Sequence, residues 1–194
     1  MTDISNLNAA LARIMAAMPV MEHELNAADA KLGDGDTGAM LARVLGKISE
    51  CPVNAEGDLG KSFAAWAQAA AMATGSSLGT LLATGLMTFA KAARGKSALD
   101  AGEIGPILLD ARDALLKRGQ SALGDKTVID GIDAVGEALN RGGDPIQAAD
   151  AVLERFRDQP CRIGRARMFG DQSRGLDDPG MLAFVKLTRL VAGA

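Results

Sequence analysis

The sequence predicts an all-α protein, and three observations lead to that class. Apolar residues recur at intervals of three and four along most of the chain, which places them on one face of a helix. Aromatic residues make up only 3% of the chain, so Ala, Leu, Val, Ile and Met must fill the core, and Ala and Leu are the best helix formers. No segment alternates apolar and polar residues with β-branched side chains, so we expect no sheet.

The first two helices flank the most unusual stretch of the chain. Apolar residues step by three and four from Ile4 to Leu25, and Pro19 inside this stripe is expected to kink or split the helix. A second helix is predicted from Thr37 to Ile48. The connection between the two helices, Asp29–Asp36, is rich in glycine and aspartate and is predicted to be a tight loop.

The third and fourth helices are predicted from a helix-capping residue and from an interruption of the apolar pattern. Asp58 is expected to cap the third helix, whose apolar face runs from Leu59 to Ala70. The segment Gly75–Ser77 interrupts this pattern, and residues 78–93 then form the fourth helix.

The fifth and sixth helices follow two polar connections. Residues 97–102 read as a turn, and the apolar stripe from Ile104 to Leu115 predicts the fifth helix. Residues 119–125 read as a polar loop, and the stripe from Val128 to Leu139 predicts the sixth.

The last two helices each begin with Asp-Pro, in which the aspartate caps the helix and the proline takes its first position. These pairs are Asp144-Pro145 and Asp178-Pro179. The loop at 160–177 between these helices is long, and loops of that length are usually functional or disordered. Its arginines favour a bound anion or a solvated charged loop, and the pattern leaves both open. They are Arg162, Arg165, Arg167 and Arg174.

Composition narrows the class of protein further. A chain of 194 residues fits a single domain covering 1–194. The net charge of −3 argues against nonspecific nucleic-acid binding. Cys51 and Cys161 match no metal spacing and are expected to be free thiols in a reducing cytoplasm. We expect neither a signal peptide nor a membrane span, since no uninterrupted apolar run reaches about 18 residues. The single histidine, His23, is expected to be a surface or satisfied helical residue rather than a base.

Asp29, Asp34 and Asp36 form the strongest candidate site. Two carboxylates about 4 Å apart repel each other by roughly 4 kcal/mol at an effective dielectric constant of 20, so three that converge need a cation. Oxygen ligands alone favour Mg²⁺ or Ca²⁺ over zinc, and Mg²⁺ commonly bridges to substrate phosphates. The alternative is that these aspartates only cap helices and shape a turn.

Two helix starts, Thr37-Gly38 and Ser76-Ser77, could offer amide groups to a phosphate, although Ser at this position is more often a simple cap. Three better-known motifs fail. Gly33–Gly38 matches the dinucleotide fingerprint in spacing but follows a helical stripe instead of a strand. Both GKS sequences, at 60–62 and 95–97, have alanine where a Walker loop needs its first glycine. An EF-hand starting at Asp34 would place Leu45 at its bidentate position.

Four stretches, in order, resemble the L-subunit, the nucleotide-binding subunit, of dihydroxyacetone kinase. Together they cover nearly the whole chain. Leu78, Val128 and Asp177 depart from the usual pattern of this family. The four matching stretches are Asp29–Gly38, Gly75–Gly79, Gly124–Asp130 and the pair Gly164–Gly170 with Ser173–Gly180.

The resemblance implies an eight-helix antiparallel barrel with the nucleotide site at one end. It implies that Mg²⁺ is held by Asp29, Asp34 and Asp36 against the phosphates of ATP or ADP. It assigns no catalytic residue on this chain beyond that site. The implied nucleotide contacts are Thr37, Gly38, Ala39, Met40, Ser76, Ser77, Gly119, Thr127, Val128, Arg165, Asp178, Pro179 and Gly180.

The resemblance also implies the function and its partners. The expected activity is that of a cytoplasmic kinase subunit of glycerol metabolism, inactive alone, which phosphorylates dihydroxyacetone or a related small keto-sugar held by a K-type subunit. A dimer or hetero-oligomer is expected, and the donor is ATP or an ADP recharged in place by a phosphocarrier protein. Two alternatives stay open: a nucleotide-binding carrier or regulatory module without turnover, and a structural helical domain whose aspartate loop has no function.

Overall fold

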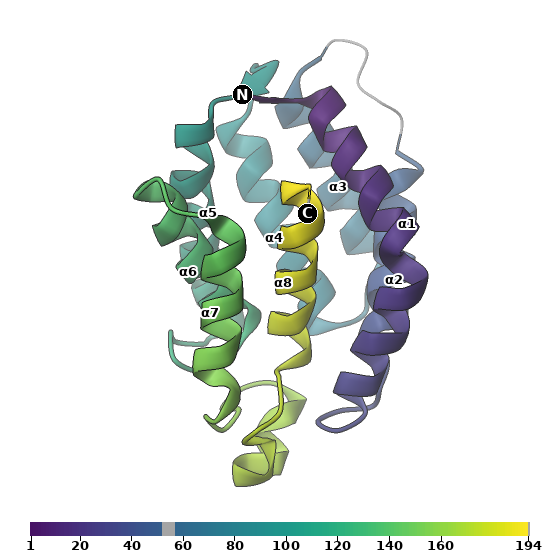
Figure 1. Cartoon of the computed structure of the whole chain (residues 1–194). Coiled ribbons are helices and arrows are strands. Elements are labelled where there is room, and N and C mark those ends of the chain that lie inside the picture. The colour runs from purple at the N-terminus through teal and green to yellow at the C-terminus, as the bar shows by residue number, and fades with distance from the viewer. Residues whose placement is uncertain (52–56, 194) are drawn as a thin grey trace.

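Eight α-helices dominate the computed structural model, which describes residues 1–51 and 57–193 (Figure 1). The helices are α1 (Ile4–Asp29), α2 (Thr37–Ser49), α3 (Leu59–Ala73), α4 (Ser77–Ala92), α5 (Ala101–Gly119), α6 (Val128–Asn140), α7 (Pro145–Arg157) and α8 (Pro179–Ala192). The short elements are β1 (Thr2–Asp3), β2 (Ala98–Leu99) and the 3₁₀ helix η1 (Arg165–Ser173).

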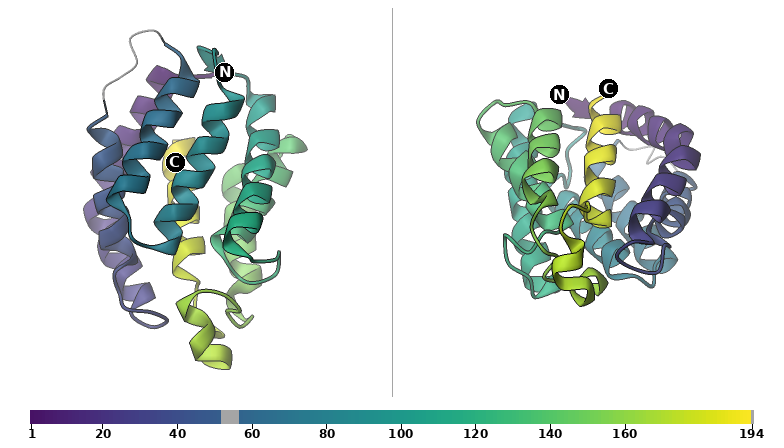
Figure 2. Two further views of the ribbon diagram at one scale, coloured as in Figure 1. Left: turned by 180° about the vertical axis from the view of Figure 1, so that it is seen from behind. Right: turned by 60° about the horizontal axis from the view of Figure 1, so that its bottom comes forward.

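The helices form a closed antiparallel ring. Each helix packs against the next along the chain, and α8 closes the ring by packing against α1 and α6. The tilted view in Figure 2 shows this arrangement from one end. Because consecutive helices alternate in direction, α2, α4, α6 and α8 begin at one end, called the mouth here, and α1, α3, α5 and α7 begin at the far end. The predicted all-α class is confirmed.

Local capping explains where several helices start. The Asp58 side chain accepts a hydrogen bond from Lys61 N at 3.2 Å, and Asp144 accepts one from Ile146 N at 2.8 Å. Asp178 accepts from Met181 N at 2.8 Å. These three predicted caps are therefore confirmed, and each satisfies an amide that the first helical turn leaves without a partner.

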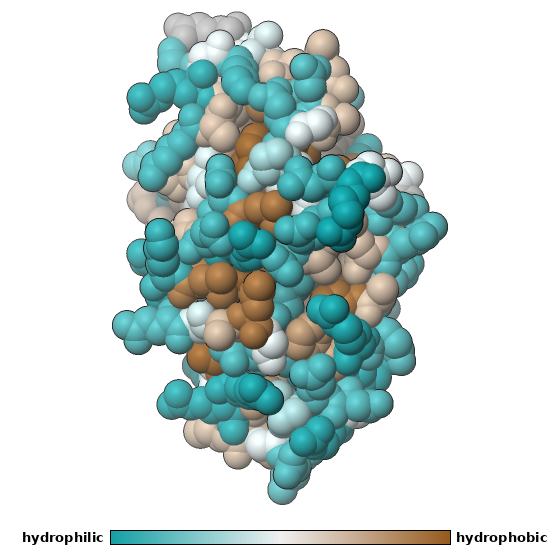
Figure 3. Space-filling view, turned by 90° about the vertical axis from the view of Figure 1, so that its left-hand side faces the viewer, coloured by the Kyte–Doolittle hydropathy of each residue, from teal (hydrophilic) through white to brown (hydrophobic). Residues whose placement is uncertain are grey.

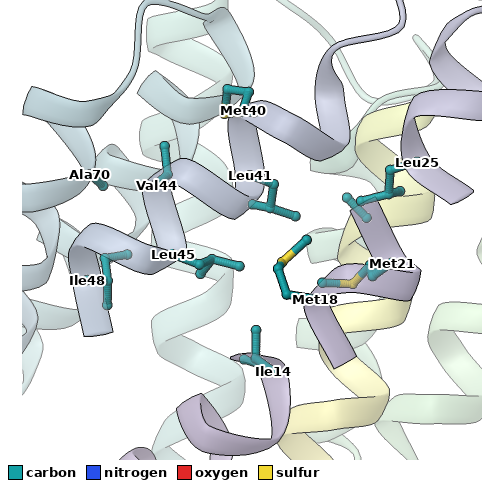
Figure 4. Close-up of a cluster of buried hydrophobic side chains, with 11 residues drawn as sticks. Ile14, Met18, Met21, Leu25, Met40, Leu41, Val44, Leu45, Ile48 and Ala70 are labelled. Atoms are coloured by element: carbon teal, nitrogen blue, oxygen red, sulfur yellow. The ribbon is translucent and has the colours of Figure 1, made fainter. Parts of the chain in front are cut away.

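Aliphatic and methionine side chains fill the core, as the composition predicts. The largest cluster lies where α1 and α2 face each other, and it includes Met18, Met21, Leu25 and Val44 (Figure 4). Val44 and Leu25 are fully buried. This packing fixes the end of α1 relative to the start of α2, which is where the aspartate loop lies.

Three local expectations need correction. Thr2 pairs with Leu99 in a two-residue antiparallel ladder, which is too short to show alternation in the sequence. The loop at 160–177 contains η1, because a 3₁₀ turn needs no apolar periodicity. Of the two alternatives for Pro19, the split is wrong because α1 continues from Ile4 to Asp29, and Pro19 itself is exposed; the kink stays a prediction.

α1 also requires comment because it is, among the described helices, the one long and apolar enough to cross a membrane by length and composition. A single such helix is weak evidence, since core helices pass the same test. Ile14, Met18 and Met21 on its apolar stripe are buried against other helices. On the opposite side of the molecule, which is the left-hand side in Figure 1, hydrophobic patches alternate with hydrophilic side chains (Figure 3). These contacts bury one stripe of α1, while 22% of its most apolar window is buried in the structure.

Candidate functional site

The mouth contains a cleft of about 460 Å³. Its wall is built from the starts of α2, α4, α6 and α8 together with the loop after α1 and the segment around η1. Each helix start is the positive end of a helix dipole, so the convergence of four of them favours an anionic ligand.

The three predicted metal aspartates meet in this cleft. One carboxylate oxygen from each of Asp29, Asp34 and Asp36 lies within 4.8 Å of the others. Asp29 is buried at the end of α1, whereas Asp34 and Asp36 are exposed. A Cβ at Gly33 would lie 2.4 Å from Asp29 Oδ1, so glycine leaves room for this carboxylate. The donor set is made only of oxygen atoms, which suits a hard cation such as Mg²⁺.

Asp29 also organises the start of α2. Its Oδ2 accepts hydrogen bonds from Asp36 N at 2.9 Å and from Thr37 N at 3.1 Å. Oδ1, on the Gly33 side, is not used in those two bonds. The same side chain thus fixes the helix start with one oxygen and keeps the other outside these two bonds.

A second residue of α1, Asn26, satisfies the next two amides. Its Oδ1 accepts from Gly38 N at 2.8 Å and from Ala39 N at 3.2 Å. Gly38 and Ala39, both predicted nucleotide contacts, do not line the cleft, whereas Thr37 and Met40 do. The amides at the start of α2 therefore already donate hydrogen bonds within the protein. Sequence reasoning missed Asn26, because its two partners lie on the next helix.

The turn before α4 presents two serines to the cleft. Ser76 caps the helix by accepting from Gly79 N at 3.1 Å, and both Ser76 and Ser77 line the wall. A Cβ at Gly79 would lie 2.0 Å from Thr74 Oγ1, which explains why glycine follows Leu78 here. Leu78 itself lies over Gly180, because a Cβ there would be 3.3 Å from Leu78 Cδ1.

Arg43 is a cleft residue that the sequence did not single out. It extends from α2 and its Nε donates to Ala73 O at 2.9 Å, at the end of α3. It thereby links α2, beside the three aspartates, to the end of α3, just before the serine turn. Only its position one helical turn after Met40 could have pointed to it.

The starts of α6 and α8 form the opposite wall. Thr127 caps α6 by accepting from Ile129 N at 3.1 Å, and Asp130 accepts from Thr127 N at 2.8 Å. Val128, Pro179 and Gly180 line the cleft beside them. Loss of hydration raises the pKa of Asp178 to about 6. Gly119 ends α5 and lies outside the cleft lining.

Arg165 comes from η1 and forms an ion pair with Asp34 across the cleft. The loop after α1 and the η1 segment also share a small apolar core, in which Leu32 packs against Cys161 and Ala166. The extra acid Asp177 is engaged by Arg157, with 2.8 Å from Arg157 Nε to its Oδ1. Other lining residues, which were not among the implied nucleotide contacts, are Leu32, Gly75, Leu78, Leu81, Ile163, Gly164 and Ala166.

Fold and site together define a class: an all-α ring with a cleft at one end, where helix starts, one arginine and three carboxylates converge. The DAK2 domain profile matches residues 31–192. The chain belongs to the DAK2 domain family.

Curated relatives include two kinase subunits that match over most of their length. The ADP-binding subunit DhaL of PEP-dependent dihydroxyacetone kinase 1 from Listeria innocua is 29% identical over 153 residues, covering 78% of this chain and 77% of that protein. The ADP-binding subunit DhaL from Escherichia coli K12 is 26% identical over 180 residues, covering 87% and 86%. L-erythrulose 1-kinase of Mycolicibacterium smegmatis is 31% identical over 186 residues, covering 87% of this chain and 32% of that protein.

Solved structures support the fold. The native dihydroxyacetone kinase of C. freundii aligns with a TM-score of 0.74 at 23% identity, and a complex of that kinase with AMP-PNP and Mg²⁺ aligns with 0.72. Each alignment covers 95% of this chain but only 33% of the kinase chain, so this chain spans about a third of that protein's length.

Proposed function

We propose that this protein is the nucleotide-binding subunit of a dihydroxyacetone kinase-type phosphotransferase. The observation that carries this proposal is the convergence of Asp29, Asp34 and Asp36 within 4.8 Å in a cleft walled by four helix starts. The ADP-binding relatives and the AMP-PNP–Mg²⁺ complex of a neighbour with the same fold support it. The proposed ligands are Mg²⁺ with ATP or ADP.

The carboxylates fit Mg²⁺ by donor type and by spacing, and a bound Mg²⁺ would supply positive charge that neutralises the phosphate oxygens. Phosphoryl transfer depends mainly on positioning and electrostatic stabilisation. The Ser76 and Ser77 hydroxyl groups and the start of α4 would orient the phosphates, and Arg165 would exchange Asp34 for a phosphate oxygen. Val128 and Pro179 would offer apolar surface to the base.

The acceptor alcohol is proposed to be held by another chain. His23 is exposed on α1 and does not line the cleft, and the described lining offers no imidazole or free carboxylate outside the metal cluster and the helix cap Asp178. The relatives from Listeria and Escherichia coli are themselves named as subunits. A cytoplasmic K-type subunit that binds a small keto-sugar is therefore the proposed partner, in a hetero-oligomer, and the chain alone is proposed to be inactive.

Calorimetry of ADP and ATP binding with Mg²⁺ and with EDTA tests the proposal. Tight binding is expected only with Mg²⁺, and Asp34→Asn should weaken it by roughly 100-fold or more, since even the loss of groups that support metal ligands costs 10- to 100-fold. Glu50→Gln, in a surface ion pair with Lys47 at 2.7 Å, is the matched control and should bind like the wild type. Unchanged Mg²⁺-dependent affinity in Asp34→Asn would instead support a structural domain whose aspartate loop has no function.

The names of the relatives leave the donor as a second question, since some are PEP-dependent subunits and others are kinases for erythrulose. If the chain works as a carrier, bound ADP should exchange with ATP very slowly and be recharged in place by a phosphocarrier protein. Fast exchange of labelled ADP would favour direct use of ATP. Dihydroxyacetone and erythrulose should then be compared as acceptors with the K-type subunit present.

A further inference from the structure

The segment that carries Arg165 leaves the barrel and returns to it at one narrow base. It departs after Arg157 at the end of α7 and returns at Gly175, whose N donates to Arg157 O at 2.9 Å. Between these points, η1 projects from the mouth end of the molecule (Figure 1). The position of Arg165 beside the aspartate loop therefore depends on how firmly this base is held.

Lys126 holds the base from outside the segment. Its Nζ donates to Arg157 O at 2.9 Å, to Gln159 O at 2.8 Å and to Ser173 O at 3.0 Å. The side chain is 1% exposed, although it carries an ammonium group. Three carbonyl acceptors match the three N–H groups of a charged lysine.

The backbone at Lys126 is adapted to this role. Its φ of 62° lies in the left-handed region, which non-glycine residues adopt rarely. The neighbouring Asp125 O accepts from Arg162 N at 3.2 Å, and the next residue, Thr127, caps α6 in the cleft wall. Lys126 thus joins the arginine segment to a wall of the cleft.

A second set of hydrogen bonds closes the segment near the same point. Ser173, which is fully buried, accepts from Cys161 N at 2.8 Å and donates from Oγ to Gly170 O at 2.5 Å. In the described part of the chain, no carboxylate forms an ion pair with Lys126. A buried charge costs several kcal/mol, so a polar group at this place demands a reason beyond filling space.

We propose that Lys126 is a positioning residue for Arg165, because it pins the base of residues 158–174 so that the guanidinium reaches the metal and phosphate position above Asp34. This inference rests on the proposed function. Lys126 does not line the cleft, and the three hydrogen bonds from its Nζ all go to the base of this segment, so its effect on Arg165 passes through the segment.

A double-mutant cycle on Mg²⁺–ADP affinity tests this proposal. Arg165→Met should weaken binding by roughly 10- to 100-fold, the value of a lost hydrogen bond to a charged group. Lys126→Met should also weaken Mg²⁺–ADP binding. The double variant should bind Mg²⁺–ADP no more than about twofold worse than Arg165→Met does. The proposal would be overturned if the fold-loss of affinity in the double variant equalled the product of the two single losses. It would also be overturned if Lys126→Met bound Mg²⁺–ADP like the wild type.

A second measurement covers the case in which Lys126→Met does not fold. Ser173→Ala removes the neighbouring link, so it should also weaken binding without adding to Arg165→Met. Limited trypsin digestion should cut Lys126→Met or Ser173→Ala faster at the arginines within residues 158–174, with cleavage outside this segment unchanged. Uniform acceleration at all sites would indicate general destabilisation and contradict the proposal. Lys186→Met, in an ion pair with Glu24 on the helices, is the control.

The outcomes separate this inference from the proposed function. If the wild-type chain binds no Mg²⁺–ADP, both the proposed function and the role of Lys126 are wrong. A wild-type chain that binds Mg²⁺–ADP, with additive losses in the cycle, removes only the role of Lys126.

Discussion

The two ends of the barrel use the same residue types for different purposes. At the far end, Asp3, Asp58 and Asp144 cap α1, α3 and α7 with their carboxylates. At the mouth, Asp36 stands at the corresponding position of α2 and makes no capping hydrogen bond. The amides that it would cap, those of Gly38 and Ala39, donate to Asn26, and Asp29 accepts from the two preceding amides.

This difference leaves the Asp36 carboxylate without a capping role. Both ends present the positive ends of four helices, so the helix dipoles do not distinguish them. What distinguishes the mouth is that Asp29 and Asn26 relieve Asp36 of its capping role, and that Arg165 reaches in from η1. The far-end carboxylates Asp3, Asp58 and Asp144 are used as caps, whereas Asp34 and Asp36 at the mouth are exposed and line the cleft.

Replacing one aspartate at each end by alanine should produce the largest contrast between nucleotide affinity and stability. Asp36→Ala should reduce Mg²⁺-dependent ADP affinity by about 100-fold or more and leave the free energy of unfolding within about 0.5 kcal/mol of the wild type. Asp144→Ala should reduce the free energy of unfolding by about 1 kcal/mol, because it removes a cap, and leave affinity unchanged. Calorimetry and urea unfolding measure the two quantities, and a variant that changed both equally would break the comparison.

A pair of glycines within α2 sharpens the comparison along one helix. A Cβ at Gly38 would lie 2.2 Å from Glu22 O of α1, whereas Gly46 has nothing within 4 Å. Gly38→Ala should therefore destabilise the fold by roughly 2–3 kcal/mol and displace the metal loop. Gly46→Ala should be neutral or stabilise it by up to about 1 kcal/mol. Urea unfolding measures both, and equal effects would show that α1 and α2 are not held at this distance near the mouth.

The caps of the two ends should also differ in their response to pH. The Ser5 hydroxyl, which donates to Asp3 at the far end, lowers the pKa of that carboxyl, whereas loss of hydration raises the pKa of Asp178 at the mouth to about 6. A raised folded-state pKa means that the stabilising contribution is complete below about pH 4 and is lost as pH rises through about 6.

The wild type should accordingly gain about 1 kcal/mol from Asp178 between pH 7 and pH 5, and Asp178→Asn should lack this gain while keeping its cap. Urea unfolding of the nucleotide-free protein at both pH values measures the difference. If the free energy of unfolding changed equally with pH in both proteins, a group other than Asp178 would be responsible for the change.

Much of the fold was predictable because its signals are local. Asp58, Asp144 and Asp178 each cap a helix through an amide two or three residues away, so a short stretch of sequence contains both partners. The expected helix from Thr37 to Ile48 differs from the observed Thr37–Ser49 by one residue. The β1–β2 pair and η1 were missed because neither produces a periodic pattern.

The candidate site was predictable only in part. Three carboxylates in one glycine-rich loop are a local pattern, and their convergence within 4.8 Å agrees with the expectation from spacing. Most of the implied nucleotide contacts line the cleft, but Gly38, Ala39 and Gly119 do not, and these assignments remain predictions.

The sequence by itself determined the helices, their caps and the presence of an acidic loop, because these depend on residues a few positions apart. Only the tertiary structure decided which groups are free to bind a ligand. Asn26 takes the amides of Gly38 and Ala39, Arg43 reaches Ala73 on another helix, and Lys126 holds carbonyls more than thirty residues away, up to 47 positions along the chain. Such partners meet only when the ring closes, so no local pattern records them.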